Sequence, residues 1–193
     1  MTNSPAPTFS TDDDRFMLRA LELARHAQEE HAEVPVGAVL VADGKIVGEG
    51  WNRSISGNDP SAHAEVMALR DAGNRLGNYR FPGTALYVTL EPCVMCSGAL
   101  VHARVERVVF AADDPKTGAA GSVFDTLVSP LHNHRIIVER GLRAVESAQM
   151  LRTFFRSRML DNAGTNVSVN NNAPNKAKPR VYASGENILP STF

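Results

Sequence analysis

Short β-branched runs alternate with helix-length segments along most of the chain, and this alternation limits the folds that it can adopt. Two runs, VGAVLVA and KIVGEGW, are joined by Asp43-Gly44, a dipeptide typical of a tight turn between antiparallel strands. The later runs TALYVTL, RVVFAA and RIIVE follow helical or long connections, which favour parallel pairing. The pattern predicts an α/β fold of three layers, α/β/α, with a central mixed five-stranded sheet.

Four segments have the apolar spacing and the end signals of helices. The first helix is predicted to have Ser10 or Thr11 as its N-terminal cap. Three aspartates follow in its first turn, where the helix dipole favours negative charge. Its buried stripe is predicted to contain Phe16, Ala20, Leu23, Ala24 and Ala27. The second reads HAEVMALRDAGNRL with Asp59 or Ser61 as its cap, the third opens at Pro92 and runs to about Val105, and the last reads LRAVESAQMLRTFFRSRML.

Composition divides the chain into one domain and two tails. Residues 1–10 are rich in Ser, Thr and Pro and are predicted to be a flexible arm. Residues 11–160 are predicted to form the single domain. Residues 161–193 are rich in Asn and poor in apolar side chains, so we expect disorder there, because such a segment buries too little to offset its ordering entropy.

Composition also excludes several classes of protein. A net charge of −1 argues against a protein that coats nucleic acid through a global basic field, although it allows a local basic patch. Two cysteines are too few for a disulfide scaffold. The N-terminus lacks a secretory signal, and no run approaches the roughly 18 apolar residues of a membrane helix. We therefore expect a soluble, cytoplasmic protein that does not contact a membrane.

The two cysteines, Cys93 and Cys96, lie in EPCVMC at the start of a predicted helix. At this spacing their thiols share one helical face, and the helix dipole favours thiolates. The pair alone is compatible with a redox disulfide, a metal site or plain packing. His63, in HAE at another predicted helix start, supplies a third ligand. One His and two Cys leave the fourth position of a zinc ion open to water, which is typical of catalytic zinc. Glu65, two residues later, would lie beside the metal, where a general base belongs.

H-x-E followed by P-C-x-x-C is the pattern of the zinc-dependent nucleoside and nucleobase deaminases. Over about residues 12–158 the chain resembles the bacterial tRNA-specific adenosine deaminases, in VPVGAVLV, GEGWNR, DPSAHAEVMALR, LYVTLEPCVMCSGAL, DPKTGAAGS and TFFR. The resemblance implies a cytidine-deaminase-like fold, one Zn²⁺ per subunit and a homodimer. It also implies hydrolytic deamination of adenosine to inosine at wobble position 34 of a tRNA anticodon stem-loop.

Carried over residue by residue, the resemblance makes His63, Cys93 and Cys96 the zinc ligands and Glu65 the proton shuttle between water and the purine. Four residues are expected to bind the flipped-out base and the attacking water: Asn52, Val36, Leu90 and, through its backbone N–H, Ala64. Four residues of the last helix are expected to contact the RNA: Arg152, Phe155, Arg156 and Arg158.

Three other functions remain open at this point. A deaminase of a free nucleobase or nucleoside (guanine, cytosine or cytidine) would use the same zinc site. A zinc-stabilised RNA- or protein-binding module would need no general base, and Glu65 argues against it. A redox protein would use the cysteines alone, and His63 argues against that function. His132 and His134, in HNH, suggest a second metal site, but a polar loop is the favoured interpretation.

Overall fold

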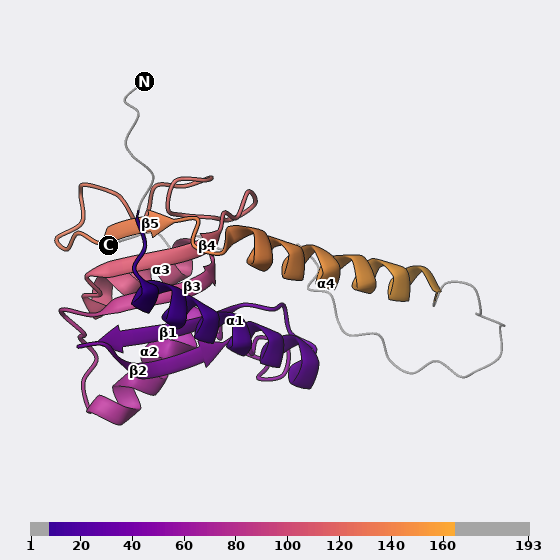
Figure 1. Ribbon diagram of the computed structural model, residues 1–193, viewed down its shortest axis with the longest axis horizontal. Helices are drawn as coiled ribbons and strands as arrows, with labels where there is room; N and C mark the ends of the chain where they lie inside the picture. Colours follow the sequence, from indigo (N-terminus) through magenta and orange to yellow (C-terminus); the bar gives the residue numbers. More distant parts are fainter. Residues whose placement is uncertain (1–7, 165–193) are drawn as a thin grey trace, which may run out of the picture.

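The computed structural model describes residues 8–164, which form a mixed sheet with helices on both faces (Figure 1). Five strands lie in the order β2-β1-β3-β4-β5. Their bounds are β1 Gly37–Ala42, β2 Lys45–Trp51, β3 Ala85–Leu90, β4 Arg107–Ala112 and β5 Ile137–Arg140. Strand β1 is antiparallel to both β2 and β3, whereas the β3–β4 and β4–β5 pairs are parallel. The predicted three-layer α/β fold with a mixed five-stranded sheet is confirmed.

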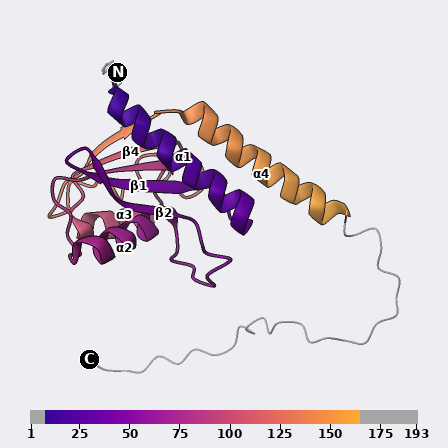
Figure 2. The same cartoon turned by 60° about the horizontal axis from the view of Figure 1, so that its bottom comes forward.

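The helices are α1 Thr11–His31, α2 Ala64–Leu76, α3 Val94–Ala103 and α4 Ala144–Gly164. Helix α1 covers one face of the sheet and α2 and α3 cover the other, while the later turns of α4 extend past the sheet (Figures 1 and 2). Most of the predicted arm (1–10) and tail (161–193) lies outside the described residues, and α4 continues beyond residue 160 to Gly164. No helix within residues 8–164 has the length and apolar character needed to span a membrane.

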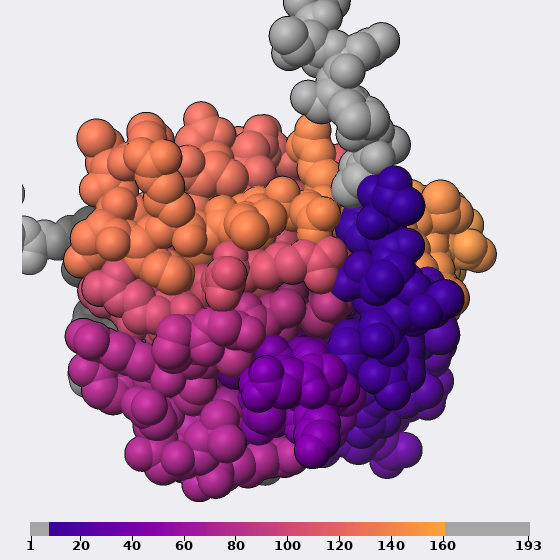
Figure 3. Space-filling view, turned by 60° about the vertical axis from the view of Figure 1, so that its left-hand side comes forward, coloured from indigo at the N-terminus to yellow at the C-terminus, as the bar shows by residue number. Residues whose placement is uncertain are grey.

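The β1–β2 turn has the geometry that its sequence predicts. Asp43 and Gly44 both have positive φ angles, 48° and 71°, and Ala42 pairs directly with Lys45. Two consecutive positive φ angles are typical of the turns that match the twist of a hairpin. The hairpin packs beside α1 on one face of the molecule, where Arg19 Nε of α1 donates to Glu49 Oε1 of β2 at 2.8 Å (Figure 3).

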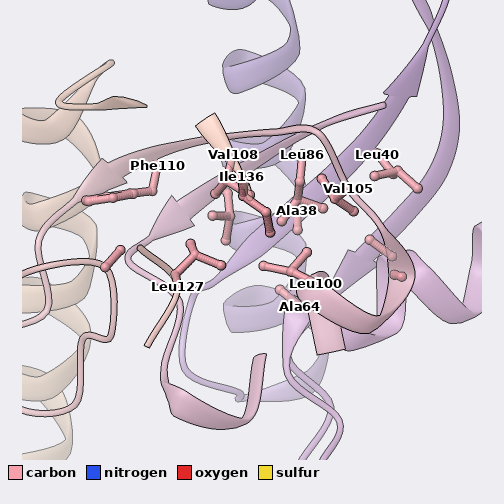
Figure 4. Close-up of a cluster of buried hydrophobic side chains, with 14 of the residues drawn as sticks. Ala38, Leu40, Ala64, Leu86, Leu100, Val105, Val108, Phe110, Leu127 and Ile136 are labelled. Carbon is pink, nitrogen blue, oxygen red and sulfur yellow. The ribbon is translucent and has the colours of Figure 1, made fainter. Parts of the chain in front are cut away.

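Alternate residues of the central strands face two separate cores, as the two-residue period of a strand requires. The core toward α2 and α3 contains Ala38, Leu40, Leu86, Val108 and Phe110 from the strands, with Ala64 and Leu100 from the helices (Figure 4). The core toward α1 contains Val39, Val41, Tyr87, Val109 and Ala111 from the strands. The predicted apolar stripe of α1 is buried at every position, so this prediction is confirmed.

Helix α2 packs close to β2 because two glycines of the strand face it. A Cβ on Gly50 would lie 2.3 Å from the carbonyl oxygen of Ala64, and a Cβ on Gly48 would lie 2.3 Å from that of Ala68. Any larger residue would therefore push the helix away from the sheet. The glycines hold the first turn of α2, next to His63, at a fixed distance from the sheet.

Two predicted helix starts were wrong by a few residues. Helix α2 begins at Ala64 with His63 as its cap, because the Oδ1 of Asp59 is engaged in a local turn with the N–H and hydroxyl of Ser61. Helix α3 begins at Val94 with Cys93 as its cap, so Pro92 lies before the helix. That helix ends at Ala103, short of the predicted Val105, because Arg104 takes a left-handed conformation (φ 62°).

The start of α1 carries a buried polar cluster centred on Asp13. Asp13 forms a reciprocal capping box with Ser10, which confirms Ser10 as the cap. The same carboxylate accepts hydrogen bonds from the hydroxyl of Tyr87 on β3 and from Arg107 Nη1 on β4. Although burial opposes it, the hydrogen bonds from Arg107, Tyr87 and Ser10 hold the pKa of Asp13 well below its usual range. One carboxylate thus joins the first turn of α1 to two strands.

The start of α4 is fixed to α1 and to β3. Arg143 donates two hydrogen bonds to Asp14, both at 2.7 Å, and Arg25 of α1 pairs with Glu146 of α4. The hydroxyl of Ser147 donates to the carbonyl oxygen of Thr89, next to the end of β3. These contacts set the direction in which α4 leaves the sheet.

Asp13→Ala is expected to lower the free energy of unfolding by about 1–3 kcal/mol, because it leaves the Tyr87 hydroxyl and one donor of Arg107 without their buried acceptor, while Arg107 keeps its ion pair with Glu139. The matched control is Asp12→Ala, which removes a carboxylate whose partner, Arg15, is exposed, and should cost less than about 1 kcal/mol. Urea unfolding measures both. Because the folded pKa of Asp13 is depressed, its contribution is complete above the unfolded pKa of about 3.9 and should shrink as the pH falls further. Equal losses of unfolding free energy in Asp13→Ala and Asp12→Ala would contradict the role of Asp13 as the centre of the buried cluster.

Candidate active site

Three ligand atoms meet where the first turns of α2 and α3 converge. His63 caps α2, Cys93 caps α3, and Cys96 is in the first turn of α3. The His63 Nδ1 atom lies 3.6 Å from each sulfur, and the two sulfurs lie 3.7 Å apart. A tetrahedral zinc ion with ordinary bond lengths requires about 3.8 Å between two sulfurs and about 3.6 Å between sulfur and nitrogen. The triangle therefore fits zinc without rearrangement.

The electrostatics of the side chains favour metal binding. Hydrogen bonds from Cys96 and His63 lower the pKa of the Cys93 thiol to about 4, against the effect of burial. The hydrogen bond to Cys93, together with burial, raises the pKa of the Cys96 thiol. The hydrogen bond with Cys93 also raises the pKa of His63. Cys93 is thus already a thiolate at neutral pH, whereas Cys96 and His63 hold protons that a bound cation would displace, since a metal ligand must be deprotonated.

Glu65 lies in the first turn of α2, two residues after His63, and only 4% of its surface is exposed. Burial raises the pKa of this carboxyl group to about 7. Together with His63 and Cys93, it lines a pocket of about 750 Å³. A carboxyl group at the edge of such a pocket can exchange protons with a ligand bound inside it.

The pocket brings together most of the residues expected to bind the substrate. Its wall includes Val36, Asn52 and Leu90, and, from α4, Arg152 and Phe155. Ala64 is fully buried and does not line the pocket. Its backbone N–H donates to the side-chain oxygen of Asn52 at 3.0 Å. That bond fixes the orientation of the Asn52 amide and leaves its NH₂ group available to a ligand.

The other two predicted RNA contacts lie outside the pocket wall. Arg156 is exposed on α4. Arg158 donates to the carbonyl oxygen of Ala32 and stacks over the ring of Phe154, so its contacts join α4 to the segment after α1. The histidines of HNH also make structural contacts: His132 Nε2 lies 2.6 Å from the carbonyl oxygen of Thr126, and His134 Nε2 lies 2.6 Å from that of Val105.

Sequence reasoning missed part of the pocket. Residues 113–117, which begin the connection after β4, form a continuous section of its wall, and Glu91 contributes beside Cys93. The sequence DPKTGAAGS in this connection resembles the deaminase family and was expected to approach the RNA, but none of its residues was assigned to the pocket. An acidic residue at the end of an apolar strand run was the available signal for Glu91, because a charge in that place is either exposed or satisfied by specific partners.

Comparisons with known proteins agree with this geometry. Residues 10–112 match the family described as the cytidine and deoxycytidylate deaminase zinc-binding region. A tRNA-specific adenosine deaminase of Haemophilus influenzae is 52% identical over 147 residues, which cover 76% of this chain and 84% of that protein. A solved structure from a study of A-to-I editing by tRNA:A34 deaminases at the wobble position of transfer RNA has 46% identity and a TM-score of 0.68, over 71% of this chain and 99% of that one. A solved structure from a study of a guanine deaminase from Nitrosomonas europaea has 27% identity and a TM-score of 0.63, over 79% of this chain and 88% of that one.

His63→Ala and Cys93→Ala should each reduce bound zinc from about one ion per chain to near none, because three protein ligands are the minimum for this site. Metal analysis of the purified proteins measures the change, and a fall in melting temperature should accompany it. The matched control is His102→Ala, in the last turn of α3 and away from the triangle. Full zinc content in either ligand variant would contradict the assigned site.

Proposed function

The chain belongs to the cytidine and deoxycytidylate deaminase zinc-binding family, and we propose that it deaminates adenosine to inosine at wobble position 34 of a tRNA anticodon. One observation carries the proposal: a buried carboxyl group, Glu65, and a zinc-ligand triangle border the same pocket. The similarity to tRNA-specific adenosine deaminases, at 46–52% identity over most of the chain, selects the substrate within the family.

The reaction replaces the C6 amino group of adenine with an oxygen from water and releases ammonia. Zinc held by His63, Cys93 and Cys96 would supply Lewis acidity, which makes a water molecule a stronger nucleophile at neutral pH. Glu65 takes the proton from that water and delivers it to N1 of the purine, which makes C6 more electrophilic. The oxygen of the water then bonds to C6, and Glu65 takes the remaining proton from that hydroxyl group and transfers it to the amino group, which departs as ammonia. The carboxyl group returns to its starting state, so one residue serves as both base and acid.

The remaining pocket residues position the base. The NH₂ group of Asn52, oriented by the Ala64 N–H, donates to a ring nitrogen of the purine. Val36 and Leu90 offer apolar surface to the faces of the base. A base inside the pocket has left its stack, which costs a few kcal/mol in a duplex and less in a single-stranded loop. An anticodon loop meets this condition.

Helix α4 supplies contacts for the rest of the RNA. Phe155, with 47% of its surface exposed, lies on the pocket wall and can stack on a neighbouring nucleotide. Arg152 lies beside it, and Arg156 is exposed further along the helix, where both can pair with phosphates. Arg158 holds α4 to Ala32, so its contribution is to place the helix. As the family resemblance implies, we propose that the protein acts as a homodimer in the cytoplasm.

An assay of the purified protein tests the substrate. We expect inosine in an anticodon stem-loop with adenosine at the wobble position, and no ammonia from free adenosine, guanine, cytosine or cytidine. Glu65→Gln should retain zinc and lose about 10²–10⁴-fold in kcat, because it removes the proton carrier but leaves the ligands intact. Ammonia from a free base, with an unchanged stem-loop, would instead indicate a nucleobase deaminase.

Asn52→Asp should lower kcat/KM on the stem-loop by about 10²-fold, because the substitution keeps the acceptor for the Ala64 N–H but replaces the pocket-facing donor with an acceptor. The matched control is Asn78→Asp: Asn78 also accepts a backbone N–H, from Arg80, but is exposed and lies outside the pocket wall. Wild-type kcat/KM in Asn52→Asp would show that this amide does not bind the base.

A further inference from the structure

Besides Glu65, the glutamates Glu33 and Glu91 are almost completely buried; neither forms an ion pair with any residue that the structure describes, and each holds a loop. Glu91, 2% exposed, lies between β3 and α3, and Glu33, 1% exposed, follows α1. A buried carboxylate is stable only when hydrogen-bond donors replace its water. In both residues the donors are backbone N–H groups of a loop distant in sequence. The two glutamates differ in which loop they hold.

Glu91 accepts from both ends of residues 114–122, in the first part of the connection after β4. Its Oε2 accepts from the N–H of Asp114 at 3.0 Å, and its Oε1 accepts from Ala120 and Ser122 at 2.8 and 3.1 Å. Three donors on one carboxylate close residues 114–122 into a ring around it. The adjoining backbone adds two bonds, because the N–H of Glu91 donates to Ala112 and that of Ala119 donates to Pro92.

The loop that Glu91 holds is a wall of the pocket. Residues 113–117 line it continuously and directly follow β4, whereas Val36 and Asn52 lie next to the ends of β1 and β2. Glu91 itself is two residues before the zinc ligand Cys93. We propose that Glu91 is a positioning residue that fixes the 113–117 wall relative to the zinc ligands, so that the loop contacts the substrate in a preset place. The inference rests on the proposed deamination of tRNA.

The close fit at Gly118 supports this role. A Cβ on Gly118 would lie 2.4 Å from Glu91 Oε2 and 2.6 Å from the carbonyl oxygen of Asp114. The Glu91 carboxylate therefore fills the space inside residues 114–122 and leaves no room for a side chain at position 118. Gly118 also pairs with Cys93 in an isolated β-bridge, so the loop lies directly against the backbone that carries this ligand.

Glu33 provides a matched comparison within the same molecule. Its Oε1 accepts from the N–H groups of Ile55 and Ser56 at 2.9 and 2.7 Å. These two residues lie outside the pocket wall. Removing the accepting oxygen of Glu33 therefore releases a loop whose two bonded residues do not line the pocket.

Glu91→Gln and Glu33→Leu, each with full zinc content, should separate positioning from general stability. Both oxygens of Glu91 accept, so a glutamine there must direct its NH₂ group at an N–H donor. A leucine at position 33 removes the single oxygen that accepts from its loop, so each variant should release its loop. For Glu91→Gln we expect kcat/KM on the stem-loop to fall about 10- to 100-fold, mainly through a higher KM, because Glu65 and the ligands lie on α2 and α3. For Glu33→Leu we expect an unchanged KM. Hydrogen exchange should increase in peptides covering 113–122 only in the first variant and in peptides covering 53–62 only in the second.

A wild-type KM for Glu91→Gln, or an equal rise in KM for both variants, would overturn the proposal. If Glu91→Gln fails to fold, Gly118→Ala tests the same contact with the carboxylate retained, and should raise both the KM and the exchange of 113–122. Wild-type values in that variant would also overturn it. If the wild-type enzyme does not act on the stem-loop, the proposed function fails, whereas the exchange measurements still decide whether Glu91 holds the loop.

Discussion

The zinc-ligand triangle exists because the sheet holds two helix starts side by side. His63 and Cys93 are the caps of two different helices and lie 30 residues apart in the sequence. Local backbone preferences cannot bring His63 Nδ1 within 3.6 Å of Cys93 Sγ. The glycines of β2 set the distance of α2 from the sheet, and the parallel β3–β4 pair places α3 on the same face. The ends of strands and the beginnings of helices meet at one edge of such a sheet, which is where α/β proteins place their ligands.

Helix α4 completes the site although it belongs to the last part of the domain. Its contacts with Asp14, Arg25 and Thr89 tie its first turns to α1 and to the end of β3. The pocket wall then includes Leu151, Arg152 and Phe155, which are contributed by a helix that continues past the sheet. A small, buried reaction centre and an extended surface for a larger substrate are thereby part of one rigid frame.

Much of this arrangement could be predicted from the sequence, and the failures have a common physical cause. The strands, the hairpin at Asp43-Gly44 and the ligands in HAE and PCVMC follow from short patterns that tertiary structure did not override. The cap of α2 was misplaced because Asp59 bonds within its own turn, a choice that propensity alone does not reveal. Glu33 and Glu91 were missed because their partners are backbone groups of distant loops. An acidic residue at the end of an apolar run signals that some partner is needed, but it does not indicate which loop supplies the donors. The roles assigned within the pocket came from family resemblance.

The two helix caps that we propose as metal ligands lower the stability of the helices they begin. Neither His63 nor Cys93 makes a side-chain capping hydrogen bond, so α2 and α3 both start without the stabilisation that a Ser, Thr, Asp or Asn cap gives, about 1 kcal/mol each. Substitutions that repaired these ends would remove the ligands. The trade-off between stability and activity is therefore located at two identifiable positions, and selection for a more robust protein must act elsewhere in the chain.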